Sequence, residues 1–128
     1  MAVSHFFDEQ YPLVYTVFSG EVTDDDFAEH SRVLLADPRF EASMPELVDL
    51  REVTRVELSA ETIPLSARSL LHAPQAKRAV VAPTDFLYGL ARMYQAYRDK
   101  ITEGDFRVFR SMPAALEWFG LTEEPRRT

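Results

Sequence analysis

The sequence contains no cysteine among its 128 residues, which excludes disulfide bonds, thiolate metal sites and cysteine nucleophiles. Glycine is scarce, at four residues, and no glycine-rich phosphate loop or dinucleotide-binding fingerprint is present. No apolar run approaches the roughly 20 residues that span a bilayer, and the first residues do not follow a signal-peptide pattern. These absences predict a cytoplasmic protein with no stable membrane insertion.

Positive charge is also in short supply. The chain has 14 Lys and Arg residues against 21 Asp and Glu residues, a formal net charge of −7. Binding to a phosphate backbone requires clustered positive charge, and the basic residues here are scattered along the chain. We therefore expect no nucleic-acid partner. The apolar content of 46% is enough for one domain over residues 1–128, in which residues 121–128 form a short polar tail.

The stretch of residues 79–94 indicates the fold class. Residues 79–82 are small or β-branched and apolar, without polar alternation, which is typical of a strand covered on both faces. Pro83 ends this strand, and Thr84 or Asp85 is suited to cap a helix that follows.

Strands and helices alternate along the rest of the chain in the same way. The predicted strands are 3–9, 12–20, 46–51, 79–82 and 105–110, and helices are expected at 23–36, from about 62, from about 85, and at 111–120. The strand could continue into residues 52–61, but the acids and hydroxyls there favour a loop. This order, β-β-α-β-α-β-α-β-α, predicts an α/β fold with a mostly parallel five-stranded sheet and an N-terminal antiparallel hairpin.

The helix that begins near Asp85 carries apolar residues on more than one face. A stripe about 60° wide is expected to be buried; it comprises Phe86, Leu90, Met93 and Tyr97. Gly89 lies beside this stripe, which predicts a close approach to the sheet. Leu87 and Tyr94 fall about 80–100° from Phe86 on the helical wheel. They either pack against a neighbouring helix or face a pocket or a second subunit, with Tyr88 left in water.

Several phrases resemble the STAS family of anti-sigma-factor antagonist domains. They are residues 34–40 (LLADPRF), 48–51 (VDLR), 81–94 (VAPTDF to GLARMY), 108–110 (VFR) and 115–119 (ALEWF). The chain is most similar to a bacterial branch called STAS-like or CRAL-TRIO-like, whose members are mostly uncharacterised. The resemblance covers almost the whole chain. It implies a STAS-like fold and a regulatory or protein-interaction module; the alternative is a carrier or sensor of a small apolar ligand or lipid.

The phosphoserine switch of STAS domains does not transfer well to this chain. In the family, a partner kinase phosphorylates a serine in a turn that follows an Asp-Leu strand end. Laid along this sequence from Asp49 and Leu50, the phosphorylated position falls on Leu58, and Ala60 replaces the family's glycine. Ser59 is one place further along, and we interpret it as a residue that caps the loop. The resemblance therefore implies a module without this switch.

Polar residues follow the predicted strands at their carboxyl ends, where open parallel sheets bind ligands. Asp49 and Arg51 are two residues apart on an extended strand and point to the same side. They either hold a polar ligand or form a structural ion pair. Asp85 places its own carboxylate at the start of a helix, which disfavours a phosphate there.

No catalytic motif is visible. His5, His30 and His72 lie in three different predicted elements without metal-ligand spacing, and there is no Gly-x-Ser-x-Gly elbow. The sequence therefore predicts a non-enzymatic protein without a cofactor or metal. Its partner is expected to be another protein, a second copy of the chain, or a small apolar ligand. The candidate residues of that surface are Asp49, Arg51, Ser59, Asp85, Leu87 and Tyr94.

Overall fold

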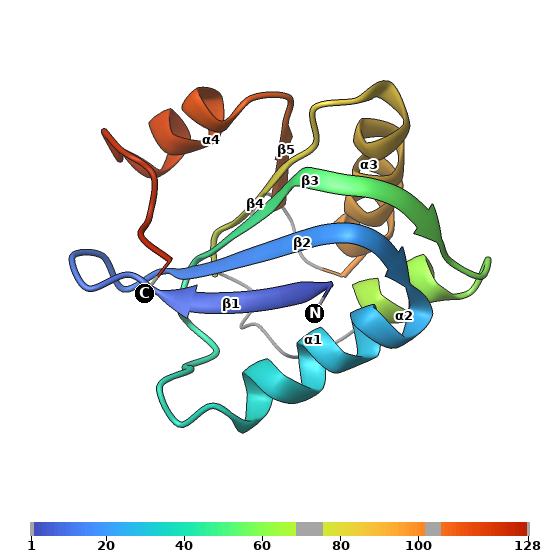
Figure 1. Ribbon diagram of the computed structural model, residues 1–128, viewed down its shortest axis with the longest axis horizontal. Coiled ribbons are helices and arrows are strands. Elements are labelled where there is room, and N and C mark those ends of the chain that lie inside the picture. Colours follow the sequence, from blue (N-terminus) through green and yellow to red (C-terminus); the bar gives the residue numbers. More distant parts are fainter. Residues whose placement is uncertain (1, 69–75, 102–105, 128) are drawn as a thin grey trace.

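The computed structural model describes residues 2–68, 76–101 and 106–127. Strands and helices follow one another as β1 (Val3–Phe7), β2 (Val14–Thr23), α1 (Asp24–Ala36), β3 (Glu46–Glu57), α2 (Thr62–Ala67), β4 (Arg78–Val81), α3 (Asp85–Asp99), β5 (Phe106–Phe109) and α4 (Met112–Phe119). Figure 1 shows their arrangement. The order predicted from the sequence is confirmed.

The strands form one five-stranded sheet in the order β1-β2-β3-β4-β5. β1 pairs with β2 in antiparallel fashion, and the other neighbours pair in parallel. Each parallel pair is joined through a helix, as a parallel connection requires. The predicted hairpin and mostly parallel sheet are therefore confirmed.

The sheet has a separate hydrophobic core on each face, because successive side chains of a strand point to opposite sides. On one face Phe18, Val48, Val80 and Phe106 form a cluster with Leu87 of α3. The cluster on the other face includes Tyr15, Val17, Leu47, Ala79 and Val81 of the strands and Met112, Ala115 and Leu116 of α4. Helices α1 to α3 therefore cover one face of the sheet, and α4 covers the other (Figure 1).

Two strands are longer than the sequence predicts. Residues 52–57, expected in a loop, continue β3 to Glu57, because β2 also continues and pairs with it as far as Thr23. Gly20 does not end β2: it has a φ of 66° and lies where the register of the two strands shifts, so the pairing resumes beyond it. The expected end of α2 near residues 73–74 lies outside the described residues.

Helix α3 buries a different face from the predicted one. Phe86 and Met93, expected in the buried stripe, are 62% and 48% exposed. Gly89 is exposed as well, and a Cβ added to it would meet no atom within 4 Å. The residues that the helix buries are Leu87, Ala91 and Arg98, which lie on another side of the helix. The predicted close approach of Gly89 to the sheet is therefore wrong.

Replacing Gly89 with alanine should stabilise the protein, because glycine in a helix costs about 1 kcal/mol relative to alanine and the space is open. We expect urea denaturation to show a free energy of unfolding higher by about 0.5–1 kcal/mol. Gly120→Ala is the matched control. Gly120 ends α4 with a φ of 77°, so alanine there should lower stability. A loss of stability in Gly89→Ala would show that this face of α3 is packed.

Candidate functional site

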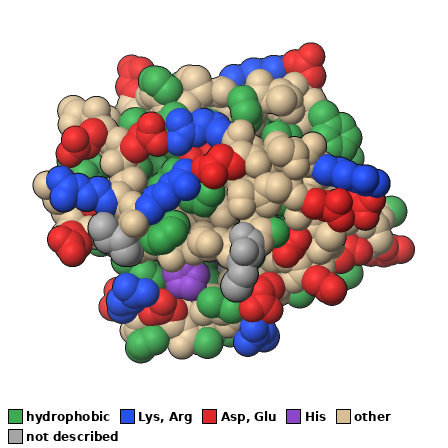
Figure 2. Space-filling model, in the orientation of Figure 1, with side chains coloured by type: hydrophobic (Ala, Val, Ile, Leu, Met, Phe, Trp, Pro, Cys, Tyr) green, Lys and Arg blue, Asp and Glu red, His purple; other side chains and the backbone are tan. Residues whose placement is uncertain are grey.

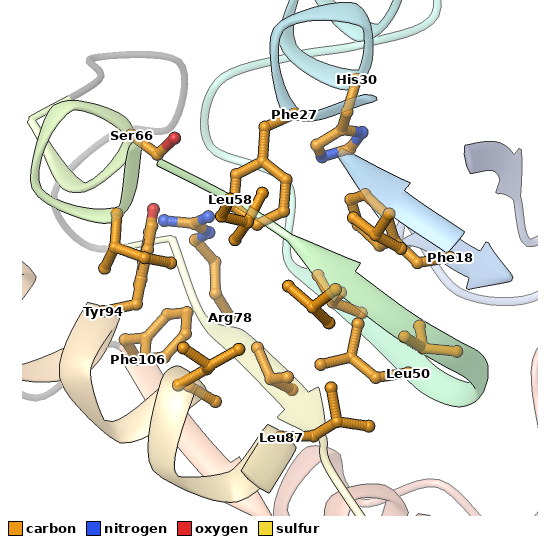
Figure 3. A pocket seen from close by; sticks show the side chains of 18 of the residues that line it. Phe18, Phe27, His30, Leu50, Leu58, Ser66, Arg78, Leu87, Tyr94 and Phe106 are labelled. Carbon is orange, nitrogen blue, oxygen red and sulfur yellow. The ribbon is translucent and has the colours of Figure 1, made fainter. Parts of the chain in front are cut away.

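A pocket lies between the sheet and helices α1, α2 and α3 (Figure 3). Its volume is about 130 Å³. The strands contribute mostly aliphatic and aromatic side chains to it, among them Phe18, Val22, Val48, Leu50, Val80 and Phe106. These residues come from β2 to β5 and belong to the face that α1 to α3 cover.

Helix α3 forms one wall of the pocket. The sequence left two alternatives for Leu87 and Tyr94: packing against a neighbouring helix, or facing a pocket or a second subunit. Both residues line this pocket. Ala91 also lines the pocket, and its small side chain leaves the space between this wall and the sheet unfilled. Leu58, at the position that corresponds to the phosphorylated serine of STAS domains, lines the pocket too.

A group of polar side chains lies on the same face, at the N-terminal ends of the strands. Glu46 of β3 is fully buried and accepts a hydrogen bond from the hydroxyl of Thr16 at 2.6 Å. The same oxygen of Glu46 is 3.1 Å from Nε2 of His30 in α1. Its other oxygen is 3.7 Å from Nε of Arg78. The parallel register places Glu46 beside Arg78, and Arg78 beside Phe106, so the sheet itself creates this group.

The guanidinium of Arg78 lies against two aromatic rings, with its Cζ 5.3 Å from the centroids of both Tyr94 and Phe106. Within the described part of the chain, neither Nε of Arg78 nor Nδ1 of His30 has a hydrogen-bond partner, although both atoms are buried. Figure 3 shows the guanidinium and the hydroxyls of Tyr94 and Ser66 pointing toward the same part of the pocket. We call Arg78, Tyr94 and Ser66 the polar corner.

Asp49 and Arg51 lie on the opposite face of the sheet and do not line the pocket. The carboxylate of Asp49, which is fully buried, is 2.8 Å from Nη2 of Arg51 and accepts a hydrogen bond from the hydroxyl of Tyr15 at 2.6 Å. Arg51 also pairs with Glu124 of the C-terminal tail at 2.5 Å. Asp49 and Arg51 therefore form an ion pair with each other on this face of the sheet.

The surroundings of this ion pair shift the pKa of two groups. Burial, helped by the hydrogen bond to Asp49, raises the pKa of Tyr15 to about 12. Burial also acts to raise the pKa of Asp49, but the hydrogen bonds from Arg51 and Tyr15 outweigh it and hold that pKa below its ordinary value. These groups are paired with one another, which suits a structural role.

Ser59 and Asp85 are exposed and lie apart from the pocket lining. The amide N–H of Ser59 donates to Asp24 of α1 at 3.0 Å, and its hydroxyl is 3.0 Å from that of Thr62 in α2. This geometry agrees with the loop-capping interpretation of Ser59. Asp85 accepts a hydrogen bond from Arg110 at 2.5 Å. Tyr88, expected in water, is half-buried beneath the guanidinium of Arg110.

Sequence reasoning missed the residues that make the pocket polar at one end. It considered the carboxyl ends of the strands, whereas Glu46 and Arg78 are the first residues of β3 and β4. A signal was present in the sequence. Glu46 is two residues from the apolar Val48, and Arg78 is two residues from the apolar Val80, so in each strand the charged and the apolar side chain point to the same face. A charge that enters a strand covered on both faces requires a buried partner.

The described residues contain no arrangement suited to a metal ion and no membrane-spanning helix. No group of three or more His, Asp or Glu side chains there is placed to hold a metal ion, and His72 lies outside this part of the chain. No helix there is long and apolar enough to cross a membrane. On the face in Figure 2, Lys and Arg side chains lie beside Asp and Glu side chains rather than in one continuous patch.

No family model matches this sequence, and no curated protein matches it. The structure is similar to the crystal structure of an uncharacterised protein of the DUF3478 family from Shewanella loihica PV-4, which has a SpoIIAA-like fold. The match covers 91% of each chain, with a TM-score of 0.57 and 19% sequence identity. This chain has a SpoIIAA-like fold. The fold implied by the STAS resemblance is thereby confirmed, and a SpoIIAA-like fold by itself does not determine a function.

The raised pKa of Tyr15 predicts a pH dependence of stability. The folded-state pKa is about 12 and the unfolded value is about 10, so the stabilisation is complete below about pH 10 and is lost as the pH rises toward 12. Between about pH 8 and pH 11 the wild type should lose about 1 kcal/mol more unfolding free energy than Tyr15→Phe. Urea denaturation at both pH values measures the difference. Equal losses of unfolding free energy in the two proteins would contradict the raised pKa of Tyr15.

Proposed function

We propose that this domain is a non-enzymatic carrier or sensor that binds one small, largely apolar molecule in the pocket. The observation that supports the proposal is a pocket of about 130 Å³ with mostly apolar walls and a few polar groups at one end. This combination is typical of small-molecule sites, in which apolar lining supplies affinity and convergent polar groups supply orientation.

The unfilled space beside α3 also supports ligand binding. Apolar side chains that line unfilled space lack some of the packing contacts that they would have in a closely packed core. A larger side chain in place of Ala91 would fill this space. A ligand that occupies the pocket would recover the lost contacts.

Two measurements test the proposal. Native mass spectrometry of the purified protein should show a small molecule retained at one per chain. Titration of the ligand-free protein with 1-hexanol and with hexanoate, followed by amide chemical shifts, should perturb residues of α3 and β3 that line the pocket. If neither probe shifts these amides at millimolar concentration and no molecule is retained, the proposal is wrong.

Filling the pocket separates ligand binding from folding. We expect Ala91→Leu to change the unfolding free energy by less than about 1 kcal/mol, because the added atoms enter open space, and to abolish binding of both probes. Ala115→Leu is the matched control, since Ala115 is a buried helical alanine packed against the other face of the sheet. It should cost about 1–3 kcal/mol through overpacking. Equal destabilisation by the two variants would contradict the presence of usable space beside Ala91.

A second candidate function is a regulatory module that associates through α3. The exposed side of this helix carries Phe86, Met93 and Tyr97 at 62%, 48% and 37% exposure, and Ile101, just beyond the end of the helix, adds to this apolar stripe at 47% exposure. We propose a second copy of this chain as the partner. Antiparallel pairing of two α3 helices would place Asp85, at the start of one helix, near Lys100, just after the end of the other. Opposite charges at the two ends favour that orientation.

Met93→Glu should weaken this association without unfolding the monomer, because it places a charge in the middle of the exposed stripe. We expect a concentration-dependent dimer in sedimentation experiments on the wild type and at least tenfold weaker dimerisation in the variant. Ala96→Glu adds the same charge to an exposed site on α3 outside the stripe and should have little effect. A wild type that stays monomeric at high concentration would exclude the second candidate.

A further inference from the structure

We infer that the ligand of this pocket is a small monocarboxylic acid, whose carboxylate is held by the polar corner of Arg78, Tyr94 and Ser66. This inference rests on the proposed function, namely that the pocket binds a small molecule. Its apolar part, of the size of one aromatic ring or a short alkyl chain, would lie against the aliphatic side chains of β3 and α3.

Arg78 is placed to receive an anion. Its Nε is buried and has no hydrogen-bond partner among the described residues, whereas buried donors in proteins are almost always bonded. The rings of Tyr94 and Phe106 lie against the guanidinium and limit its movement. A guanidinium presents several N–H groups in one plane, which matches the two oxygens of a carboxylate. Figure 3 shows the hydroxyls of Tyr94 and Ser66 aimed at the same place, where each would add a donor.

Glu46 does not accept a hydrogen bond from Arg78. Its carboxylate lies 3.7 Å from Nε of Arg78, beyond hydrogen-bond distance. Among the described residues, the nearer contacts of Glu46 include the hydroxyl of Thr16 at 2.6 Å and His30 at 3.1 Å. Glu46 therefore stabilises the buried charge of Arg78 electrostatically and leaves the donors available to a ligand.

The charges beside the pocket disfavour a dianion. Among the described residues that line the pocket, Arg78 is the one Lys or Arg side chain, and Glu46 already lies 3.7 Å from it, so a dianionic phosphate would meet repulsion. An ammonium group offers no acceptor to the N–H donors of Arg78. The volume of about 130 Å³ is close to that of an apolar cavity of about 150 Å³ that binds benzene, which limits the apolar part of the ligand to a similar size.

The decisive comparison uses three probes of one length: hexanoate, 1-hexanol and hexylamine at neutral pH. Charge-assisted hydrogen bonds should make the dissociation constant of hexanoate at least about tenfold lower than those of the other two, measured by calorimetry or NMR titration. Equal or tighter binding of 1-hexanol or hexylamine overturns the carboxylate inference and leaves the proposed function standing. If none of the three probes binds, the inference fails, and the proposed function fails with it when native mass spectrometry also shows no retained molecule.

Variants locate the carboxylate within the pocket. Arg78→Met should weaken hexanoate about tenfold and leave 1-hexanol unchanged. Arg92→Met is the matched control, because it removes the same charge from an exposed position on α3. Tyr94→Phe removes only the hydroxyl and should weaken hexanoate about threefold, which keeps the test valid if Arg78→Met does not fold. Wild-type affinity for hexanoate in Tyr94→Phe, together with wild-type affinity in any folded Arg78→Met, would overturn the assignment.

Discussion

The alternation of side chains between two covered faces of one sheet determines where every other feature of this domain lies. Val48 and Asp49 are neighbours in the chain, yet one lines the pocket under α1 to α3 and the other forms an ion pair on the α4 side. No residue of the central strands can serve both faces. The pocket and the network around Asp49 are therefore separate parts of the molecule, and changes in one need not perturb the other.

Each face of the sheet also contains a fully buried carboxylate, and the two differ in their surroundings. Asp49 is bonded by Arg51 and Tyr15, and the C-terminal tail adds Glu124 to the network. Buried ion pairs of this kind are tolerated because hydrogen bonds offset the cost of desolvation. Around Glu46, by contrast, the neighbouring Arg78 keeps a buried nitrogen without a hydrogen-bond partner in the described residues. This difference is why we assign structure to the first site and ligand binding to the second.

Local signals in the sequence were sufficient for the order of strands and helices. Apolar β-branched runs bounded by Pro and Gly, together with helix caps such as Thr84 and Ser111, act within a few residues of one another, and the structure has both caps. The length of β3 was not predictable in this way, because residues 52–57 become a strand by pairing with the extension of β2 beyond Gly20. That pairing is a contact between distant segments.

The sequence by itself determined the fold class, the antiparallel hairpin and the proximity of Asp49 to Arg51, since each depends on residues close together in the chain. Only the tertiary structure decided which side of α3 is buried. That helix has apolar residues around more than half of its circumference, so its own pattern suits either orientation, and packing against the sheet selected Leu87 and Ala91. The polar corner likewise depends on register: Arg78 meets Phe106 and Tyr94 because three separate elements converge there, and no local spacing encodes that convergence.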